Sequence, residues 1–265
     1  MENAPPLGIG YYTVTEASQL ARIPALSIRR WLGGYHFASR DQTYFSEPLW
    51  APQLARANGH LELGFRDLIE LRFVDAFERA GLSLQAIRKC LAVAREAVGD
   101  ERPFSTARFR TDGRTIFLQA LSDSDEPKLL DLARKQYAFN QIVEPTFKDI
   151  ELLDGVPARW WPFDGKKTIV VDPTRAFGQP LVSACGIPTA VLAEAVSVEG
   201  SPAKAARAYE VPLKLVRDAV RFEQELHSLR CSSITIFLPA SHEPFTSLLS
   251  PRILWSRWAK GFQSM

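Results

Sequence analysis

The side chains best suited to specific chemistry are arginines near the N-terminus. Between Ala17 and Arg40 the only charged residues are Arg22, Arg29, Arg30 and Arg40 itself. The planar guanidinium group of arginine donates two parallel hydrogen bonds to guanine O6 and N7, an interaction that distinguishes bases. This stretch is therefore locally cationic and predicts a contact with nucleic acid, whereas the net charge of +2 for the whole chain predicts nothing by itself.

The elements that must position these arginines are two short helices around a proline. Pro24 separates the helices, Thr15 is the expected N-cap of the first, and Gly33 and Gly34 end the second. Apolar residues recur at helical spacing in both segments. They are Ala17, Leu20 and Ala21 in the first, and Ile28, Trp31 and Leu32 in the second. The pattern predicts a helix-turn-helix.

In that arrangement Ser27, Arg29 and Arg30 face outward from the second helix, where such residues reach base edges and phosphates. An isolated Arg-Arg pair is more often a solvated helix surface, but the surrounding pattern favours DNA. The next residues, 35–44, suit a small hairpin wing or an ordinary surface loop. The DNA-binding candidates are Arg22, Ser27, Arg29, Arg30, His36 and Arg40.

Two segments resemble MerR-type regulators. The first is Tyr12-Thr-Val-Thr-Glu-Ala-Ser-Gln-Leu-Ala with Ile23-Pro24 and Ile28-Arg-Arg-Trp31, and the second is residues 65–89, with similarity to about Val98. The resemblance implies a winged helix-turn-helix followed by a helix, a glycine turn and another helix. Sensor members of that family end in a long coiled coil and cysteines. Neither follows here, and Cys90 has no partner at metal-ligand spacing, so metal sensing is not expected.

The middle of the chain predicts strands and one helix. Asp112-Gly113 suits a hairpin turn within residues 106–119, and a helix is expected from Pro127 to Tyr137. Residues 147–171 predict two more strand-and-turn units around Asp154-Gly155 and Asp164-Gly165, with Trp160 and Trp161 as packing residues. A small sheet would then join the helical modules, although residues 121–127 also suit a flexible linker.

Residues 169–182 and 186–191 lead into the strongest helical periodicity of the chain, where Ser201-Pro202 is an N-cap with proline in the first turn and Val211-Pro212 repeats the same break. Residues 167–226 resemble a domain of unknown function found in bacterial antitoxins. The similarity rests on Val171-Asp-Pro, Phe177-Gly-Gln-Pro, Gly186-Ile-Pro-Thr and Tyr209-Glu-Val-Pro. It implies a tri-helical unit that binds DNA or dimerises. Its cations, Lys204, Arg207, Lys214, Arg217 and Arg221, do not decide between these roles, and dimerisation is slightly favoured.

The combination of both modules resembles VapB-type antitoxins, whose toxin partner is a PIN-like ribonuclease. This resemblance implies repression of the operon through double-stranded operator DNA, direct occlusion of the toxin, and a homodimer. Candidate toxin-binding residues in the tail are Arg252, Trp255, Arg257, Trp258 and Lys260. The alternative is that the tail packs on the chain's own core.

The expected fold is mainly α with small β elements. It comprises an N-terminal MerR-like winged helix-turn-helix in residues 1–100, a connecting region with a small antiparallel sheet in 101–166, a tri-helical domain in 167–230 and a tail in 231–265. Three scattered cysteines, no signal sequence and no long apolar run predict a cytoplasmic protein. No catalytic, metal or cofactor motif is found, so an enzyme is not expected. A stand-alone regulator without a toxin partner, or a scaffold, are the alternative functions.

Overall fold

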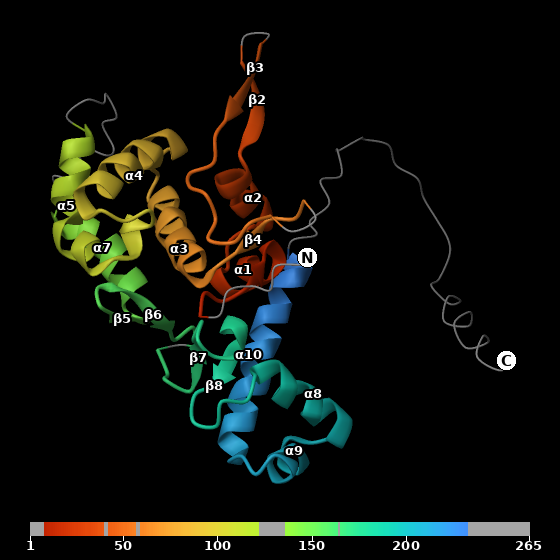
Figure 1. Ribbon diagram of the computed structural model, residues 1–265. Helices are drawn as coiled ribbons and strands as arrows, with labels where there is room; N and C mark the ends of the chain where they lie inside the picture. Colours follow the sequence, from red (N-terminus) through yellow and green to blue (C-terminus); the bar gives the residue numbers. More distant parts are fainter. Residues whose placement is uncertain (1–7, 40–41, 57–58, 122–135, 164, 233–265) are drawn as a thin grey trace, which may run out of the picture. The chain divides into compact units, whose positions relative to one another are not determined.

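The computed structural model describes residues 8–39, 42–56, 59–121, 136–163 and 165–232. These residues form mainly helices with small antiparallel sheets, as the sequence predicts (Figure 1). Within these ranges no helix combines the length and apolar character needed to cross a bilayer. The tail residues proposed to bind a toxin lie outside the described ranges.

The N-terminal elements are two short helices followed by a two-stranded hairpin. They are β1 (Tyr12–Thr13), α1 (Val14–Ala21), α2 (Ala25–Gly33), β2 (Tyr35–Ser39), β3 (Gln42–Ser46) and β4 (Glu62–Leu63), with β1 paired to β4 and β2 to β3. The predicted helices are confirmed, but the N-cap is Thr13 and not Thr15. Thr13 and Glu16 form a reciprocal capping box. The Thr13 hydroxyl accepts from the backbone N–H of Glu16, and the Glu16 carboxylate accepts from the backbone N–H of Thr13.

Two long helices come next, α3 (Phe65–Arg79) and α4 (Leu84–Val98). The turn between them contains Gly81 at φ 90°, in line with the glycine turn that the resemblance implies, and Ser83, whose side chain caps α4. A 3₁₀ turn, η1 (Pro103–Ser105), then leads into α5 (Ala107–Leu121).

Helix α5 corrects the hairpin predicted for residues 106–119. Asp112 and Gly113 lie inside the helix and form no turn. A Cβ at Gly113 would lie 2.8 Å from the ring of Phe139, so the glycine allows close packing of an aromatic side chain. Burial of one face of α5, including Phe109, Ile116 and Phe117, outweighs the turn preference of the Asp-Gly pair.

The predicted helix from Pro127 to Tyr137 lies mostly outside the described residues, and α7 (Gln136–Phe147) begins near its end. A four-stranded antiparallel sheet follows in the order β5-β6-β7-β8. Its strands are β5 (Ile150–Leu153), β6 (Val156–Trp160), β7 (Ile169–Val171) and β8 (Pro180–Val182). The turn at Asp154-Gly155 is confirmed, and Trp160 is buried, as expected of a packing residue.

The tri-helical unit consists of α8 (Thr189–Glu199), α9 (Pro202–Ala208) and α10 (Leu213–Ser232). Before it, the 3₁₀ turn η2 (Ala176–Gly178) contacts the N-terminal strand β1. The backbone N–H of Tyr11 donates to the carbonyl of Phe177 at 2.9 Å, and the buried hydroxyl of Tyr12 donates to the carbonyl of Gly178 at 2.8 Å. These bonds join segments 166 residues apart in the sequence.

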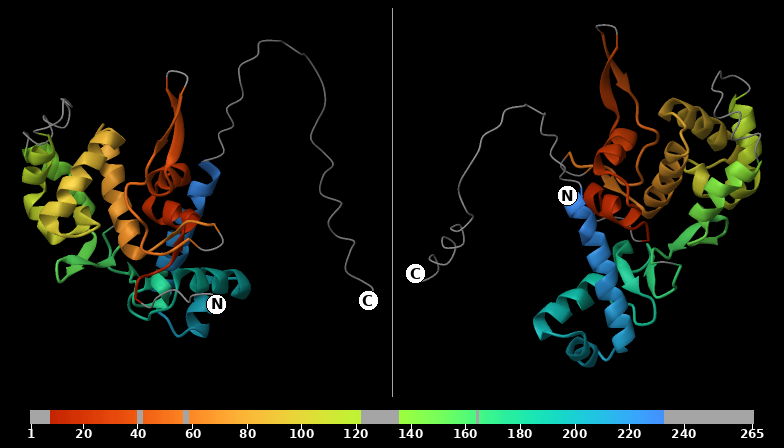
Figure 2. Two further views of the ribbon diagram at one scale, coloured as in Figure 1. Left: turned by 45° about the horizontal axis from the view of Figure 1, so that its top comes forward. Right: turned by 180° about the vertical axis from the view of Figure 1, so that it is seen from behind.

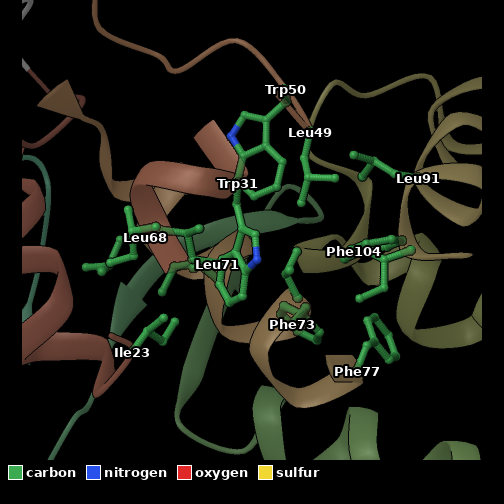
Figure 3. Close-up of a cluster of buried hydrophobic side chains, with 14 of the residues drawn as sticks. Ile23, Trp31, Leu49, Trp50, Leu68, Leu71, Phe73, Phe77, Leu91 and Phe104 are labelled. Carbon is green, nitrogen blue, oxygen red and sulfur yellow. The ribbon is translucent and has the colours of Figure 1, made fainter. Parts of the chain in front are cut away.

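One hydrophobic core extends from Tyr12 to Val171 and includes Phe222 of α10. Figure 3 shows Trp31 of α2 packed toward Leu68 and Leu71 of α3, with Leu49 and Trp50 from the segment after the hairpin beside them. Smaller clusters, one of which contains Ala205, Ala206, Val211 and Val216, hold α8, α9 and α10 together.

Candidate nucleic-acid interface

Helix α2 has one buried face and one exposed face. Ile28, Trp31 and Leu32 are at most 2% exposed, which anchors the helix on the core. The 3.6-residue repeat then places Arg29 and Arg30 on the solvent side, and both are exposed. The structure thus leaves this cationic face of α2 open.

Ser27 is half-buried, and the neighbouring Leu26 is 68% exposed. An apolar side chain so exposed suits contact with a partner surface, for example a thymine methyl group.

Arg30 and Arg29 differ in their surroundings. The Arg30 guanidinium lies 4.3 Å from the centre of the Tyr35 ring on β2, and a hydrogen bond with Arg30 lowers the pKa of the Tyr35 phenol. Arg29 has no ion-pair or hydrogen-bond partner within the described ranges. Arg30 is therefore held against the hairpin, whereas Arg29 remains available to a partner.

The β2–β3 hairpin extends beyond α2 (Figures 1 and 2) and exposes aromatic rings on both faces. On one face Phe37 and Tyr44 stack across the strands, with ring centres 5.6 Å apart. On the other face His36 lies 4.8 Å from Phe45, its partner in the register. Arg40, predicted near the tip, lies outside the described residues.

Gly34 joins α2 to the hairpin in a conformation that favours glycine. Its φ is 72° and its ψ is 172°. A Cβ there would lie 2.5 Å from the Phe45 ring and 2.8 Å from the Ser46 carbonyl oxygen. The absence of a side chain therefore lets the hairpin start directly at the end of α2.

Arginines of α4 hold the segment that leaves the hairpin. Arg88 donates to the Ser46 hydroxyl at 3.3 Å and also to the Glu47 carbonyl. Arg95 donates to the Leu49 carbonyl at 2.9 Å. The base of the hairpin is thus fixed to α4, while its far end points away from the helices.

Asp67 of α3 is the centre of a buried polar network beneath this segment. Its carboxylate accepts from the Arg102 guanidinium at 2.6 Å and the Trp50 indole at 2.9 Å. It also accepts from the backbone N–H of Gln53 at 2.8 Å and of Gly64 at 2.9 Å. Asp67 is 0% exposed, so this network compensates the loss of hydration of the carboxylate.

One helical turn later, Glu70 binds the start of η1. Its carboxylate accepts from the backbone N–H of Phe104 at 2.9 Å and of Ser105 at 3.0 Å. Burial raises the pKa of Glu70 to about 7, and these hydrogen bonds only partly oppose that effect.

The structure places Ser27, Arg29 and Arg30 on α2 and His36 on β2, the next element along the chain. Arg22 is engaged elsewhere, because its guanidinium lies 3.5 Å from the Glu225 carboxylate on α10. Arg22 also has a positive φ of 58°, which ends α1.

Sequence reasoning missed the aromatic partners Tyr35 and Phe45 and the supporting residues Asp67 and Arg88. The alternating aromatic residues of 35–45 were a visible signal for the first two. Arg88 carries no local signal, because its partners lie 41 and 42 residues away. Asp67 has one local contact, with the backbone N–H of Gly64 three residues earlier, but its other partners lie 14 to 35 residues away.

No protein-family model matches the chain. A protein of Mycobacterium tuberculosis named "Putative antitoxin VapB45" is 27% identical over 187 residues, which cover 66% of this chain and 78% of that protein. The crystal structure of Rv2018, also from Mycobacterium tuberculosis, has a TM-score of 0.63 and 24% identity, and the match covers 79% of this chain and 96% of that one. The described fold is thus found in a solved protein, and the sequence is similar to a protein named as an antitoxin.

Proposed function

We propose that this chain is the antitoxin of a type II toxin–antitoxin system, which represses its own operon and neutralises a PIN-like ribonuclease by direct binding. The observation that carries the proposal is the similarity to VapB45, which extends over 66% of this chain. In this proposal the chain acts by binding and has no catalytic function of its own.

The proposed DNA contact is a MerR-like winged helix-turn-helix formed by α1, α2 and the β2–β3 hairpin. Helix α2 presents Leu26, Arg29 and Arg30 on its open face, and the major groove of B-DNA admits an α-helix. The hairpin follows directly, so its end would reach the adjacent phosphates as a wing. This placement supports operator recognition by α2.

The proposed active form is a homodimer. A two-fold dimer would bind inverted half-sites about one helical turn of DNA apart, or a multiple of that spacing. Footprinting of a single undivided half-site would argue against the dimer.

The proposed toxin contact includes the tail residues Arg252, Trp255, Arg257, Trp258 and Lys260. Their cations suit the metal-binding carboxylates of a PIN-like nuclease, and two tryptophans three positions apart suit an amphipathic helix in a groove.

Co-expression with the product of the adjacent gene tests the proposal. We expect a stable complex on size-exclusion chromatography, no ribonuclease activity in that complex, and activity once the toxin is purified alone. The matched control is the same toxin co-expressed with a chain that ends at residue 232. Full ribonuclease activity in the presence of the intact chain would disprove neutralisation, and the protein would then fit a stand-alone regulator.

DNA binding is tested separately with a duplex from immediately upstream of the chain's own coding region. An electrophoretic shift specific to this duplex is expected. Equal affinity for an unrelated duplex of the same length would disprove operator recognition.

A further inference from the structure

We infer that α9 and α10 form a second DNA-binding helix-turn-helix, because their N-cap, their turn and the start of their second helix repeat those of α1 and α2. The inference rests on the proposed function in one respect, namely that the DNA is the operator. It adds a second reading helix to the same chain.

The repeat begins at the N-caps. The Thr13 hydroxyl accepts from the backbone N–H of Glu16 at 3.2 Å, and the Ser201 hydroxyl accepts from that of Lys204 at 3.3 Å. Nine positions after each cap residue comes a non-glycine residue of positive φ. Arg22, nine after Thr13, has a φ of 58°, and Glu210, nine after Ser201, has a φ of 55°. The first helix of each unit therefore begins at an equivalent position, and α9 ends one residue earlier than α1.

The turns that follow are closed by the same hydrogen bonds. The backbone N–H of Ile23 donates to the carbonyl of Ser18 at 3.1 Å, and that of Val211 donates to the carbonyl of Ala206 at 2.9 Å. Ile23 and Val211 are 1% and 6% exposed, so each turn is pinned by a buried branched side chain. In both units the N–H donates to the carbonyl five residues earlier, and the residue just before the donor has positive φ.

The second helices also correspond. Pro24 and Pro212 each precede a helix by one residue, and the residue four positions later, Ile28 or Val216, is 0% exposed. The N–H of that residue donates to the carbonyl of the proline, at 3.2 Å in the first unit and 3.4 Å in the second. This shared register fixes which side chains face solvent.

Arg217 occupies the position of Arg29, five residues after the proline, and both are exposed. Lys214 occupies the position of the exposed Leu26. Lys214, Arg217 and Arg221 then lie on one side of α10, since they are three and four residues apart. The side of α10 that corresponds to the exposed face of α2 thus carries a row of cations.

Two of these cations, Lys214 and Arg217, are available to an anionic partner. Lys214 and Arg217, with Lys204 and Arg207 on α9, have no ion pair across the described parts of the chain. Arg221 pairs with Glu225 at 2.9 Å. Binding of Lys214 or Arg217 to phosphate would therefore break no existing ion pair.

The nearest acids on these helices do not neutralise the row. Asp218 is partly buried, and its Oδ2 is shielded from solvent. Glu225 faces Arg22 and Arg221 one turn further along α10. Duplex DNA fits the open part of α10 because it offers both phosphates and a groove that accommodates a helix.

The test uses the full chain and the upstream duplex. Lys214→Ala with Arg217→Ala is compared with Arg29→Ala and with the control Lys148→Ala, an exposed lysine outside both units. Affinity is measured by fluorescence anisotropy at several salt concentrations, and contacts by hydroxyl-radical footprinting. Circular dichroism melting checks that each variant is folded.

We expect the double variant to raise Kd at least about tenfold, to reduce the slope of log K against log salt by roughly two, and to lose part of the footprint. Lys148→Ala should match the unmodified chain. If the double variant binds like Lys148→Ala, with an unchanged footprint and salt slope, the inference is wrong even where Arg29→Ala abolishes binding.

The two proposals fail in different ways. If Arg29→Ala leaves binding unchanged while the double variant loses it, the reading role of α2 fails and the inference about α10 stands. If the double variant keeps its DNA affinity but no longer binds the product of the adjacent gene, α10 is a protein-binding surface and the inference is overturned.

Discussion

Arg102 and Asp67 form a buried ion pair, with Nε and Oδ1 2.6 Å apart, beneath the segment that leaves the β2–β3 hairpin. Arg102 also donates to the carbonyl of Ala51 at 2.8 Å. The pair therefore connects α3 to both the hairpin's exit segment and the start of η1.

Replacement of Asp67 by alanine should destabilise the protein by about 3–5 kcal/mol, because it leaves the Arg102 cation buried without its partner. The free energy of unfolding is measured by urea denaturation. The control is Glu151→Ala, which removes one bond from the exposed Arg159 and should cost about 0–1 kcal/mol. Equal losses in the two variants would show that the Asp67 network adds no stability.

Glu70 should make stability depend on pH. Its pKa is raised from 4.5 to about 7 in the folded protein, so the native state binds more protons than the unfolded state between these values. Stability from this group is therefore full below pH about 4.5 and falls as the pH rises through about 7.

Glu70→Gln removes that titration. We expect urea denaturation between pH about 5 and about 8 to show a flatter pH dependence in the variant. The variant should also lose about 1–3 kcal/mol, because an amide offers one acceptor where the carboxylate served two backbone N–H groups. Glu96→Gln, at an exposed position, is the control. Parallel pH curves for Glu70→Gln and the unmodified chain would contradict the assignment.

Gly34→Ala should lower stability by about 1–3 kcal/mol, because alanine rarely adopts this backbone conformation and its Cβ would meet Phe45. Gly33 supplies a matched control, since it is helical and a Cβ there would approach the Arg56 side chain only to 3.7 Å. Thermal melting of both variants distinguishes a specific effect from a general one. A loss at Gly33 as large as at Gly34 would refute the proposed constraint.

Arg29→Ala should weaken binding to the upstream duplex by about 1–3 kcal/mol and leave thermal stability unchanged, because its side chain is exposed. Arg29→Lys keeps the charge but cannot form the planar two-bond contact. We therefore expect the lysine variant to recover affinity for any duplex without recovering preference for the operator. Full recovery of that preference would indicate a phosphate contact at Arg29.

Local rules were sufficient for much of the fold. Pro24 and Gly34 punctuate the N-terminal helices where the sequence predicts, and Ser83 caps α4. The N-cap of α1 was misplaced, although Thr13 and Glu16 have the spacing of a capping box.

The error at Asp112-Gly113 has a different cause. The dipeptide favours a turn in isolation, but Phe109, Ile116 and Phe117 recur at helical spacing and are buried. Long-range packing against Phe139 decides the outcome, and no local rule includes it. The helical spacing was nevertheless visible and should outweigh a single turn signal.

The candidate site was only partly visible in the sequence. The open face of α2 follows from periodicity, whereas the engagement of Arg22 with Glu225 joins residues distant in the sequence. The contact of the Arg72 guanidinium with the Trp160 ring, at 4.5 Å, also joins residues far apart in the sequence and carries no local signal.

The contact between Tyr12 and Gly178 also affects synthesis of the protein. At ~5–20 residues per second, translation of the 166 intervening positions takes roughly ten to thirty seconds. During that interval the Tyr12 hydroxyl lacks the Gly178 carbonyl that accepts its hydrogen bond. The N-terminal segment therefore gains its full set of native hydrogen bonds only after the ribosome has passed the η2 turn.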